Sequence, residues 1–157
     1  MMTDSSIEID ASARSVWDVF VDVERWPEWT ASVQRIVPLD GAGIEVGNRF
    51  EIKQPRLPKL TWEVTEVDPG VSWTWCQRSP GATTCASHEV VALGPERTLI
   101  RQRIHRRGPV GVAVGASMQR LTKRYLALEA RGLKARSEGS VVSSVQESKS
   151  TSEAMNR

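Results

Sequence analysis

Six strand-like segments follow one another between residues 32 and 107, and a single long helical segment comes after them. The strand-like segments alternate apolar and polar residues and are separated by turn signals such as DPG and GPE. A strand at residues 5–10 and two short helices, the first capped by Ser12, come before them. Between residues 112 and 133 the alternation stops, and one apolar stripe recurs at helical spacing: Val114, Met118, Leu121, Tyr125 and Leu128. This order predicts an α+β fold, with one antiparallel sheet of about seven strands and a helix against one face.

The predicted helix is too narrow to cover the predicted sheet. Seven strands at about 4.8 Å each make a sheet roughly 34 Å wide, whereas a helix with its side chains is about 10 to 12 Å across. The sheet must therefore curve around the helix. The remaining space is either filled by large side chains or left as a cavity, and a mixed apolar and polar lining favours a small-molecule pocket.

Trp73 and Trp75 lie two positions apart in a chain that has six tryptophans. Side chains alternate along a strand, so both indoles point to the same face. The hairpin registers that keep each face consistent place Trp73 opposite His88 and Trp75 opposite Ala86. That face and the helical stripe supply nine candidate ligand-binding residues, six as apolar walls and three as hydrogen-bonding groups: Trp62, Trp73, Trp75, Met118, Leu121 and Tyr125, with Gln54, His88 and Gln102.

Four pieces of the chain resemble a known family: IEIDASARSVWDVFVDVERWPEW, VGNRFEIKQPRLPKLTWEVTEVDPG, SHEVVALGPERTLI and LTKRYLALEARGLKARSE. In their order and spacing, from Ile7 to about Glu138, they resemble the START-related helix-grip (SRPBCC) superfamily and, within it, the bacterial polyketide cyclase/dehydrase and lipid-transport group. The resemblance implies the helix-grip (Bet v 1/START-like) fold, with a deep hydrophobic cavity between the sheet and the C-terminal helix. It also implies ligands such as lipids, polyketides or other aromatic and isoprenoid-like molecules. Members of the group range from cyclases and dehydratases to carriers, so no catalytic residue is carried over to this chain.

The leading hypothesis is a protein that binds a small hydrophobic molecule in this cavity. The alternative is an enzyme of the cyclase or dehydratase type, in which His88 moves a proton, because imidazole exchanges a proton near neutral pH. A buried histidine that is hydrogen-bonded to its neighbours is the simpler interpretation of His88. No carboxylate in the sequence is a convincing orienting partner for it. The helical segment KRYLALEARGLKAR is interpreted as a solvated face opposite the apolar stripe.

A second alternative is an interaction module that uses the basic segment RQRIHRR at residues 101–107. Strand alternation puts Arg101, Arg103 and His105 on the outer face of the sheet. We favour a solvated face with cross-strand partners, such as Glu89 opposite Arg101, because no exposed aromatic residues are interleaved for base stacking. The chain has 21 basic and 19 acidic residues, so no general attraction to nucleic acid is expected.

Two smaller features leave alternatives open. Cys76 and Cys85 lie symmetrically about the turn SPGA and can be cross-strand neighbours. Two unpaired residues on the outer face are favoured over a disulfide, because a reducing cytoplasm is expected. In RWPEW, Trp26 and Trp29 either cover the pocket mouth or anchor the short helices to the sheet.

The sequence predicts one domain, residues 1–136, followed by a disordered serine-rich tail, residues 137–157. The N-terminus lacks the basic and apolar regions of a signal peptide, and no apolar run reaches the length of a membrane span, so a cytoplasmic protein is expected. The expected partner is a small hydrophobic ligand, with no nucleic acid, no integral membrane contact, no metal and no cofactor. Monomer and homodimer both remain open.

Overall fold

The structure is a computed structural model that describes the backbone of residues 1–154 and the side chains of residues 1–139. The elements follow in the order β1 (Met2–Ile9), α1 (Ala13–Val21), the 3-10 helix η1 (Val23–Glu28), β2 (Arg35–Pro38), β3 (Arg49–Lys53), β4 (Leu60–Asp68), β5 (Ser72–Ser79), β6 (Ala82–Gly94), β7 (Arg97–Arg107) and α2 (Pro109–Ala154). The seven strands form one antiparallel sheet in the order β1-β7-β6-β5-β4-β3-β2. The predicted α+β helix-grip architecture is therefore confirmed.

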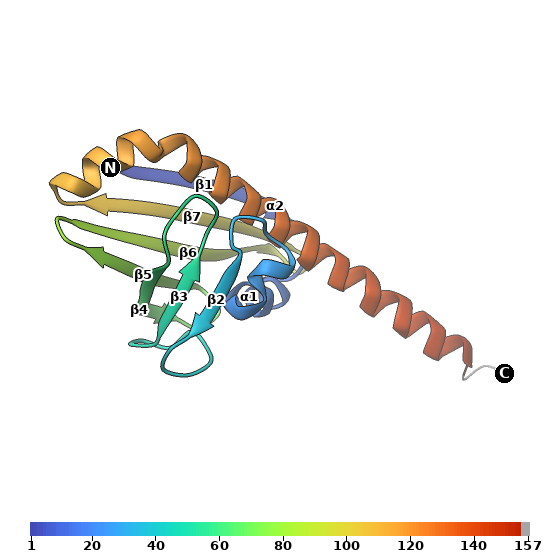
Figure 1. Ribbon diagram of the computed structural model, residues 1–157. Helices are drawn as coiled ribbons and strands as arrows, with labels where there is room; N and C mark the ends of the chain where they lie inside the picture. Colours follow the sequence, from blue (N-terminus) through green and yellow to red (C-terminus); the bar gives the residue numbers. More distant parts are fainter. Residues whose placement is uncertain (155–157) are drawn as a thin grey trace.

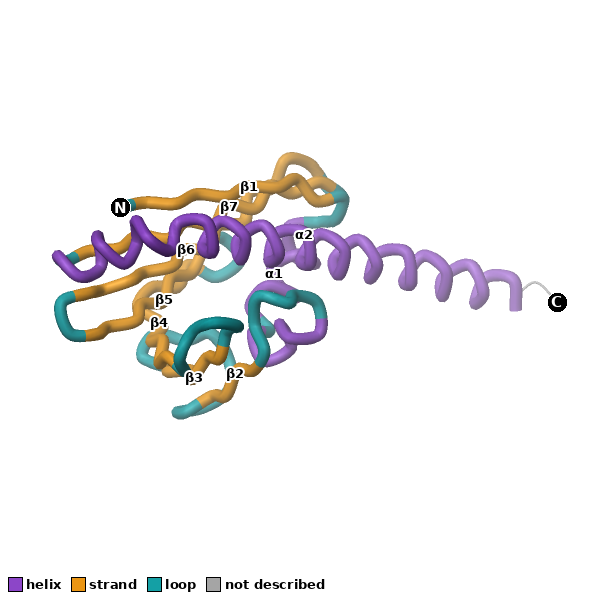
Figure 2. Tube along the Cα trace, turned by 45° about the horizontal axis from the view of Figure 1, so that its top comes forward, coloured by secondary structure: helices purple, strands orange, loops and turns teal. Residues whose placement is uncertain are grey.

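The long helix α2 covers only part of the sheet. It packs against β1, β7, β6 and α1, and it continues beyond the edge of the sheet (Figure 1). The strands β2 and β3 curve away from α2 (Figure 2), and η1 packs against β2 at that end. The mismatch in width that the sequence predicts is thus met by curvature and by the two short helices after β1.

The hairpin registers match the predicted ones. Trp73 pairs with His88, and Trp75 pairs with Ala86 across β5 and β6. His88 in turn pairs with Gln102 across β6 and β7. Helix α1 begins at the predicted cap, where the Ser12 hydroxyl accepts the Ser15 backbone N–H at 3.2 Å. The inner face of the sheet therefore carries the residues that alternation assigned to it.

The buried face of α2 is rotated from the predicted stripe. Val114 is 41% exposed, whereas the positions that pack onto the rest of the chain include small and polar residues: Thr122, Tyr125, Leu126, Glu129, Ala130, Leu133 and Ser137. At Gly132 the helix comes so close to the chain after η1 that a side chain would overlap the carbonyl oxygen of Trp29. A count of large apolar residues does not detect a face built this way.

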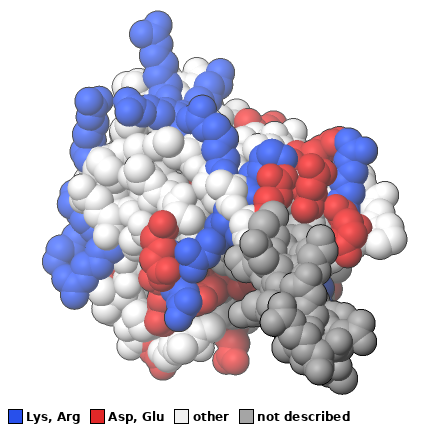
Figure 3. Space-filling view, turned by 90° about the vertical axis from the view of Figure 1, so that its right-hand side faces the viewer, with Lys and Arg blue, Asp and Glu red and all other residues white. Residues whose placement is uncertain are grey.

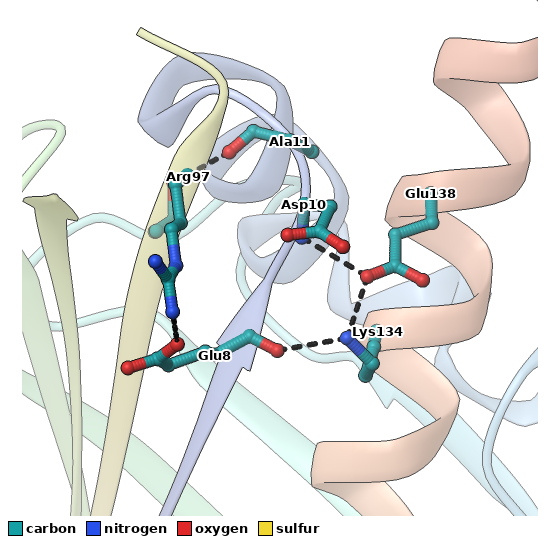
Figure 4. Close-up of polar contacts among 7 residues, drawn as sticks. Glu8, Asp10, Ala11, Arg97, Lys134 and Glu138 are labelled. Carbon is teal, nitrogen blue, oxygen red and sulfur yellow. Dashed lines mark hydrogen bonds and ion pairs between the residues drawn. The ribbon is translucent and has the colours of Figure 1, made fainter. Parts of the chain in front are cut away.

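The far part of the α2 packing surface is fastened to the end of β1 (Figure 4). The Lys134 ammonium donates to the Glu8 carbonyl at 3.0 Å and to the Glu138 carboxylate at 2.6 Å, and Glu138 also accepts the Asp10 N–H at 3.0 Å. Ser137 is fully buried. The packed part of the chain thus continues past the predicted boundary at residue 136.

The trace of α2 continues as helix to Ala154. The side chains from residue 140 onward, and the whole of residues 155–157, lie outside the described residues. For residues 140–157 the predicted disorder of the tail, which was placed at residues 137–157, therefore stays a prediction.

Cys76 and Cys85 form a disulfide between β5 and β6. They are directly opposite each other in the register, with their Cα atoms 4.1 Å apart. The sequence interpretation of two unpaired cysteines was wrong, because it relied on an expected compartment although the hairpin geometry allows a bond. The cytoplasmic location itself stays a prediction.

Arginines on the basic outer face of β7 pair with cross-strand carboxylates, as the favoured interpretation predicted. Arg101 pairs with Glu89 at 3.5 Å and Arg103 pairs with Asp4 at 2.7 Å. Basic and acidic side chains are also both present on the face of the domain from which α2 extends (Figure 3). Among the described residues, no helix combines the length and hydropathy needed to cross a bilayer.

Candidate functional site

A cavity of about 290 Å³ lies between the inner face of the sheet and α2. Eight of the nine candidate ligand-binding residues line it: Gln54, Trp62, Trp75, His88, Gln102, Met118, Leu121 and Tyr125. Trp73 does not line it. Its indole is packed behind His88, with the two rings stacked at a centroid distance of 3.8 Å. The two tryptophans of β5 therefore have different surroundings, since Trp75 borders the cavity and Trp73 fills the core.

Trp26 stands at the centre of an aromatic cluster that forms one end of the cavity wall. Its ring lies 5.7 Å from Phe20, 5.7 Å from Trp75 and 6.0 Å from Trp73. The indole N–H donates to the Phe20 carbonyl at 2.9 Å, which ties η1 to α1. Such ring pairs stabilise by about 0.5 to 1.5 kcal/mol each beyond the area that they bury. Of the two roles considered for RWPEW, Trp26 therefore has the anchoring one.

His88 is buried among these rings in its neutral form. Its Nδ1 lies 3.3 Å from the Trp73 carbonyl oxygen. A carbonyl only accepts, so Nδ1 carries the proton and Nε2 carries the lone pair. Burial lowers the pKa of His88 to about 3, and the hydrogen bond to Trp73 offsets only part of this effect. An imidazole with so low a pKa is a weak proton acceptor at neutral pH.

Glu129 on α2 is a buried carboxyl group that lines the same cavity. The Ser32 hydroxyl donates to its Oε1 at 3.1 Å, and the Gln102 amide donates to its Oε2 at 2.8 Å. Burial raises the pKa of Glu129 to about 7, although both hydrogen bonds act in the opposite direction. Glu129 can therefore hold or release a proton near neutral pH, which His88 cannot.

Arg106, near the end of β7, also lines the cavity. Its guanidinium donates to the Thr122 hydroxyl at 2.9 Å. Partial burial lowers the pKa of Arg106, yet an arginine keeps its charge in proteins. The cavity thus has two charged or titratable groups at different places: the guanidinium of Arg106 on β7, near the start of α2, and the carboxyl group of Glu129 farther along α2.

The loop between β3 and β4 reaches toward α2 (Figure 1). The Tyr125 hydroxyl donates to the carbonyl of Pro55 in this loop. Leu57 and Pro58 from the same loop line the cavity, and Pro58 is exposed to solvent. Tyr125 therefore serves as a wall of the cavity and also fastens the loop that borders it.

Comparison with protein families gives a match over most of the chain. The model described as "Polyketide cyclase / dehydrase and lipid transport" matches residues 3–138. The chain belongs to this polyketide cyclase/dehydrase family. The resemblance to the START-related superfamily that the sequence pieces indicated is thereby confirmed. The comparison with curated proteins found no match.

Solved structures with the same fold include members of several kinds. A START superfamily protein from Mycobacterium smegmatis is 20% identical, with 88% of this chain and 97% of that chain covered and a TM-score of 0.69. The Zhui aromatase/cyclase from Streptomyces sp. R1128 is 14% identical, with 90% and 95% covered and a TM-score of 0.74. Norcoclaurine synthase from Thalictrum flavum, in complex with dopamine and hydroxybenzaldehyde, is 16% identical, with 85% and 84% covered and a TM-score of 0.67. At these identities the likeness shows the fold.

Two cavity residues of this polyketide cyclase/dehydrase family member, Glu129 and Arg106, are absent from the candidates that the sequence supplied. Glu129 follows Tyr125 by four residues, so the helical spacing already places it on the inward side, but its charge suggested a solvated position. Arg106 follows Gln102 and Ile104 at strand spacing, but among the basic residues of this strand only Arg101, Arg103 and His105 were assigned to a face. In both cases the spacing along the element predicts an inward position, but a charged residue is normally expected in solvent.

Proposed function

We propose that this protein binds a small hydrophobic molecule in the cavity between the sheet and α2. The observation that carries the proposal is the composition of the wall, in which Trp62, Trp75 and Leu121 surround a space of about 290 Å³ and a few polar groups point inward. Ligand sites are concave, mostly apolar and equipped with a small number of placed polar groups. The volume is near the lower limit of such sites, which favours one or two fused rings or a chain of medium length.

The comparisons support a ligand of this kind. The norcoclaurine synthase of similar fold is seen in complex with two small aromatic molecules, dopamine and hydroxybenzaldehyde. The family description includes both lipid transport and polyketide chemistry. Lipid, aromatic and polyketide-like molecules all meet the requirement for a compact apolar body.

Filling the cavity should weaken ligand binding without unfolding the protein. Met118 is half-buried and lines the cavity, so we expect Met118→Trp to lower affinity for a small aromatic probe at least 10-fold, because the indole occupies the probe's volume. Ala116 is exposed on the same helix, and Ala116→Trp is the matched control. Binding is measured with 1-naphthol by isothermal titration calorimetry, and retained molecules are sought by native mass spectrometry. Equal loss in both variants, or loss in neither, would remove the cavity from the proposal.

A second candidate function is enzymatic, of the cyclase or dehydratase type, on the same ligand class. Glu129 is the observation that favours it, because a carboxyl group with a pKa of about 7 beside an apolar cavity suits general acid or base catalysis. We assign proton transfer to Glu129 in this case. His88, with its pKa lowered to about 3, would instead orient the ligand.

Native mass spectrometry, followed by chromatography of the released molecule, separates the two candidate functions. An enzyme whose Glu129 is replaced by Gln should retain unreacted substrate, because loss of a general acid or base slows turnover by about 100-fold or more. For a dehydratase, the retained molecule would then be heavier by one water than the molecule retained by the unmodified protein. A carrier should retain the same mass in both. Identical masses, recovered from protein produced in the same host, would exclude a dehydratase. Ring closure without loss of water leaves the mass unchanged, so a cyclase is distinguished from a carrier by a difference in chromatographic retention between the molecules released from the two proteins.

A further inference from the structure

The arginines of β7 divide into two kinds according to the face that they occupy. On the outer face, Arg97, Arg101 and Arg103 each pair with a carboxylate, from Glu8, Glu89 and Asp4 respectively, and the exposed Arg107 donates to His105. Arg106 is on the inner face, and among the described side chains its hydrogen-bonding partner is the neutral hydroxyl of Thr122. Among the described side chains, Arg106 therefore has no counter-ion, although it lies beside an apolar cavity.

A half-buried guanidinium beside an apolar cavity is held in an unfavourable environment unless an anion joins it. Arg106 has five N–H donors in a planar fork, and Thr122 accepts from one nitrogen, Nη2. The remaining donors match a carboxylate or a phosphate, both of which accept two parallel hydrogen bonds from arginine. Val110 and Val114 line this end of the cavity and are both more than 40% exposed, so an anionic group placed here stays close to solvent.

The other end of the cavity holds a polar atom that is buried and unsatisfied. Gln102 is 2% exposed, and its amide nitrogen donates to Glu129, but its Oε1 has no hydrogen-bond partner among the described residues. Buried polar atoms are nearly always paired, so this oxygen marks a place for a ligand group. A hydroxyl group fits whichever way the Gln102 amide is turned, because a hydroxyl both donates and accepts.

The two ends are separated by the length of a small molecule. Gln102 and Arg106 are four residues apart on β7, which corresponds to about 13 Å along a strand. Their helix partners, Glu129 and Thr122, are seven residues apart on α2, or about 10 Å. Both estimates indicate a ligand whose polar groups are about 10 to 13 Å apart with an apolar body between them.

We propose that the cavity binds a hydroxylated organic acid of medium length, whose anionic group pairs with Arg106 and whose hydroxyl at the opposite end pairs with Gln102. The inference rests on the proposed function, since it names the class of molecule that the cavity takes. The apolar body contacts Trp62, Trp75 and Leu121 between the two polar ends. A carboxylate and a phosphate monoester share the chemistry that Arg106 recognises, and probes of both kinds can be compared.

The test uses three probes of equal chain length: 10-hydroxydecanoic acid, decanoic acid and 1-decanol. Each is titrated into the full chain by isothermal titration calorimetry at neutral pH. We expect the hydroxy acid to bind about 5-fold more tightly than decanoic acid, because its hydroxyl satisfies a buried atom. Arg106→Met should lower the affinity of both acids about 10-fold or more and change that of 1-decanol less than 2-fold. Arg101→Met, which removes an equal charge from the outer face of the same strand, is the control and should change none of them.

Two further readouts keep the test decisive. If Arg106→Met does not fold, added salt on the unmodified protein takes its place, since screening should weaken the acids and leave 1-decanol unchanged. Decyl phosphate in place of decanoic acid distinguishes a phosphate from a carboxylate at the Arg106 end, and tighter binding of either supports an anion site. Acids that bind no better than 1-decanol, or a hydroxyl that weakens binding, would overturn the inference and leave the proposed function standing. Failure of all the probes, 1-decanol included, would count against the proposed function itself.

Discussion

Replacing Glu129 with Gln is expected to give a protein whose free energy of unfolding rises steadily between about pH 4.5 and pH 6.5, whereas that of the unmodified protein changes little over this range. Two buried groups with opposite pKa shifts produce the difference. His88 has a pKa lowered from 6.5 to about 3, and Glu129 has a pKa raised from 4.5 to about 7. Each shift makes stability depend on pH, in opposite directions.

The contribution of His88 rises with pH. Between about pH 3 and pH 6.5 the unfolded chain binds a proton at this histidine and the folded protein does not, so acid favours unfolding. The contribution of Glu129 falls with pH. Between about pH 4.5 and pH 7 the folded protein holds a proton at this carboxyl and the unfolded chain has lost it, so base favours unfolding. The two slopes cancel where these ranges overlap.

The size of the effect is within easy reach of measurement. One titrating group changes stability by about 1.4 kcal/mol per pH unit, so over the two overlapping units each variant should gain or lose about 3 kcal/mol. Urea unfolding at pH 4.5, 5.5 and 6.5 measures it. Glu129→Gln should give a rising profile and His88→Gln a falling one. If the unfolding free energies of Glu129→Gln and His88→Gln changed with pH in the same direction, the two groups would not have the opposite pKa shifts described here.

Gly132→Ala should destabilise the fold by about 3 kcal/mol, although alanine is normally the better residue inside a helix. The added Cβ would overlap the Trp29 carbonyl oxygen and lie 3.0 Å from the Trp29 ring atom Cε3. To relieve the overlap, α2 must move away from the chain that follows η1, and Leu133, which is 1% exposed, must lose part of its packing. For a domain of this size the thermal midpoint should fall by roughly 6 to 12 °C.

The same helix provides a control for this substitution. Among the described residues, a Cβ at Gly139 meets no atom within 4 Å. Gly139→Ala should therefore raise stability by up to about 1 kcal/mol, the ordinary gain from replacing glycine in a helix. Both variants are compared by thermal unfolding followed by circular dichroism at the helix band. Equal stabilisation of the two would show that α2 and the η1 segment are not in close contact in solution.

The sequence predicts the strand registers and the cavity of this protein, but it does not predict the surroundings of every residue. Strand alternation and turn signals predict the registers that bring Trp73, His88 and Gln102 together, because a wrong register would expose a whole apolar face. The width of the sheet predicts the cavity. The different surroundings of Trp73 and Trp75 are not predictable, because they depend on how Trp26 packs from a distant part of the chain.

Charged residues are where sequence reasoning about the site fails. Glu129 and Arg106 are placed correctly by periodicity, yet their charge alone suggests solvent. Their burial depends on partners that are distant in sequence, Ser32 and Gln102 for the carboxyl and Thr122 for the guanidinium. The disulfide is missed for a different reason, since register predicts that Cys76 and Cys85 are opposite each other but does not report the chemistry of the compartment.

The bond between Cys76 and Cys85 has a consequence for the aromatic wall beneath it. If β5 slid along β6 by one residue, both indoles would turn out to solvent; if it slid by two, they would stay inside but Trp73 would no longer stack on His88. A covalent cross-link on the opposite face excludes both arrangements, even when the hairpin opens locally and its hydrogen bonds are lost. The alignment of the rings that border the cavity is thus fixed from outside the cavity, by two residues that never touch its contents.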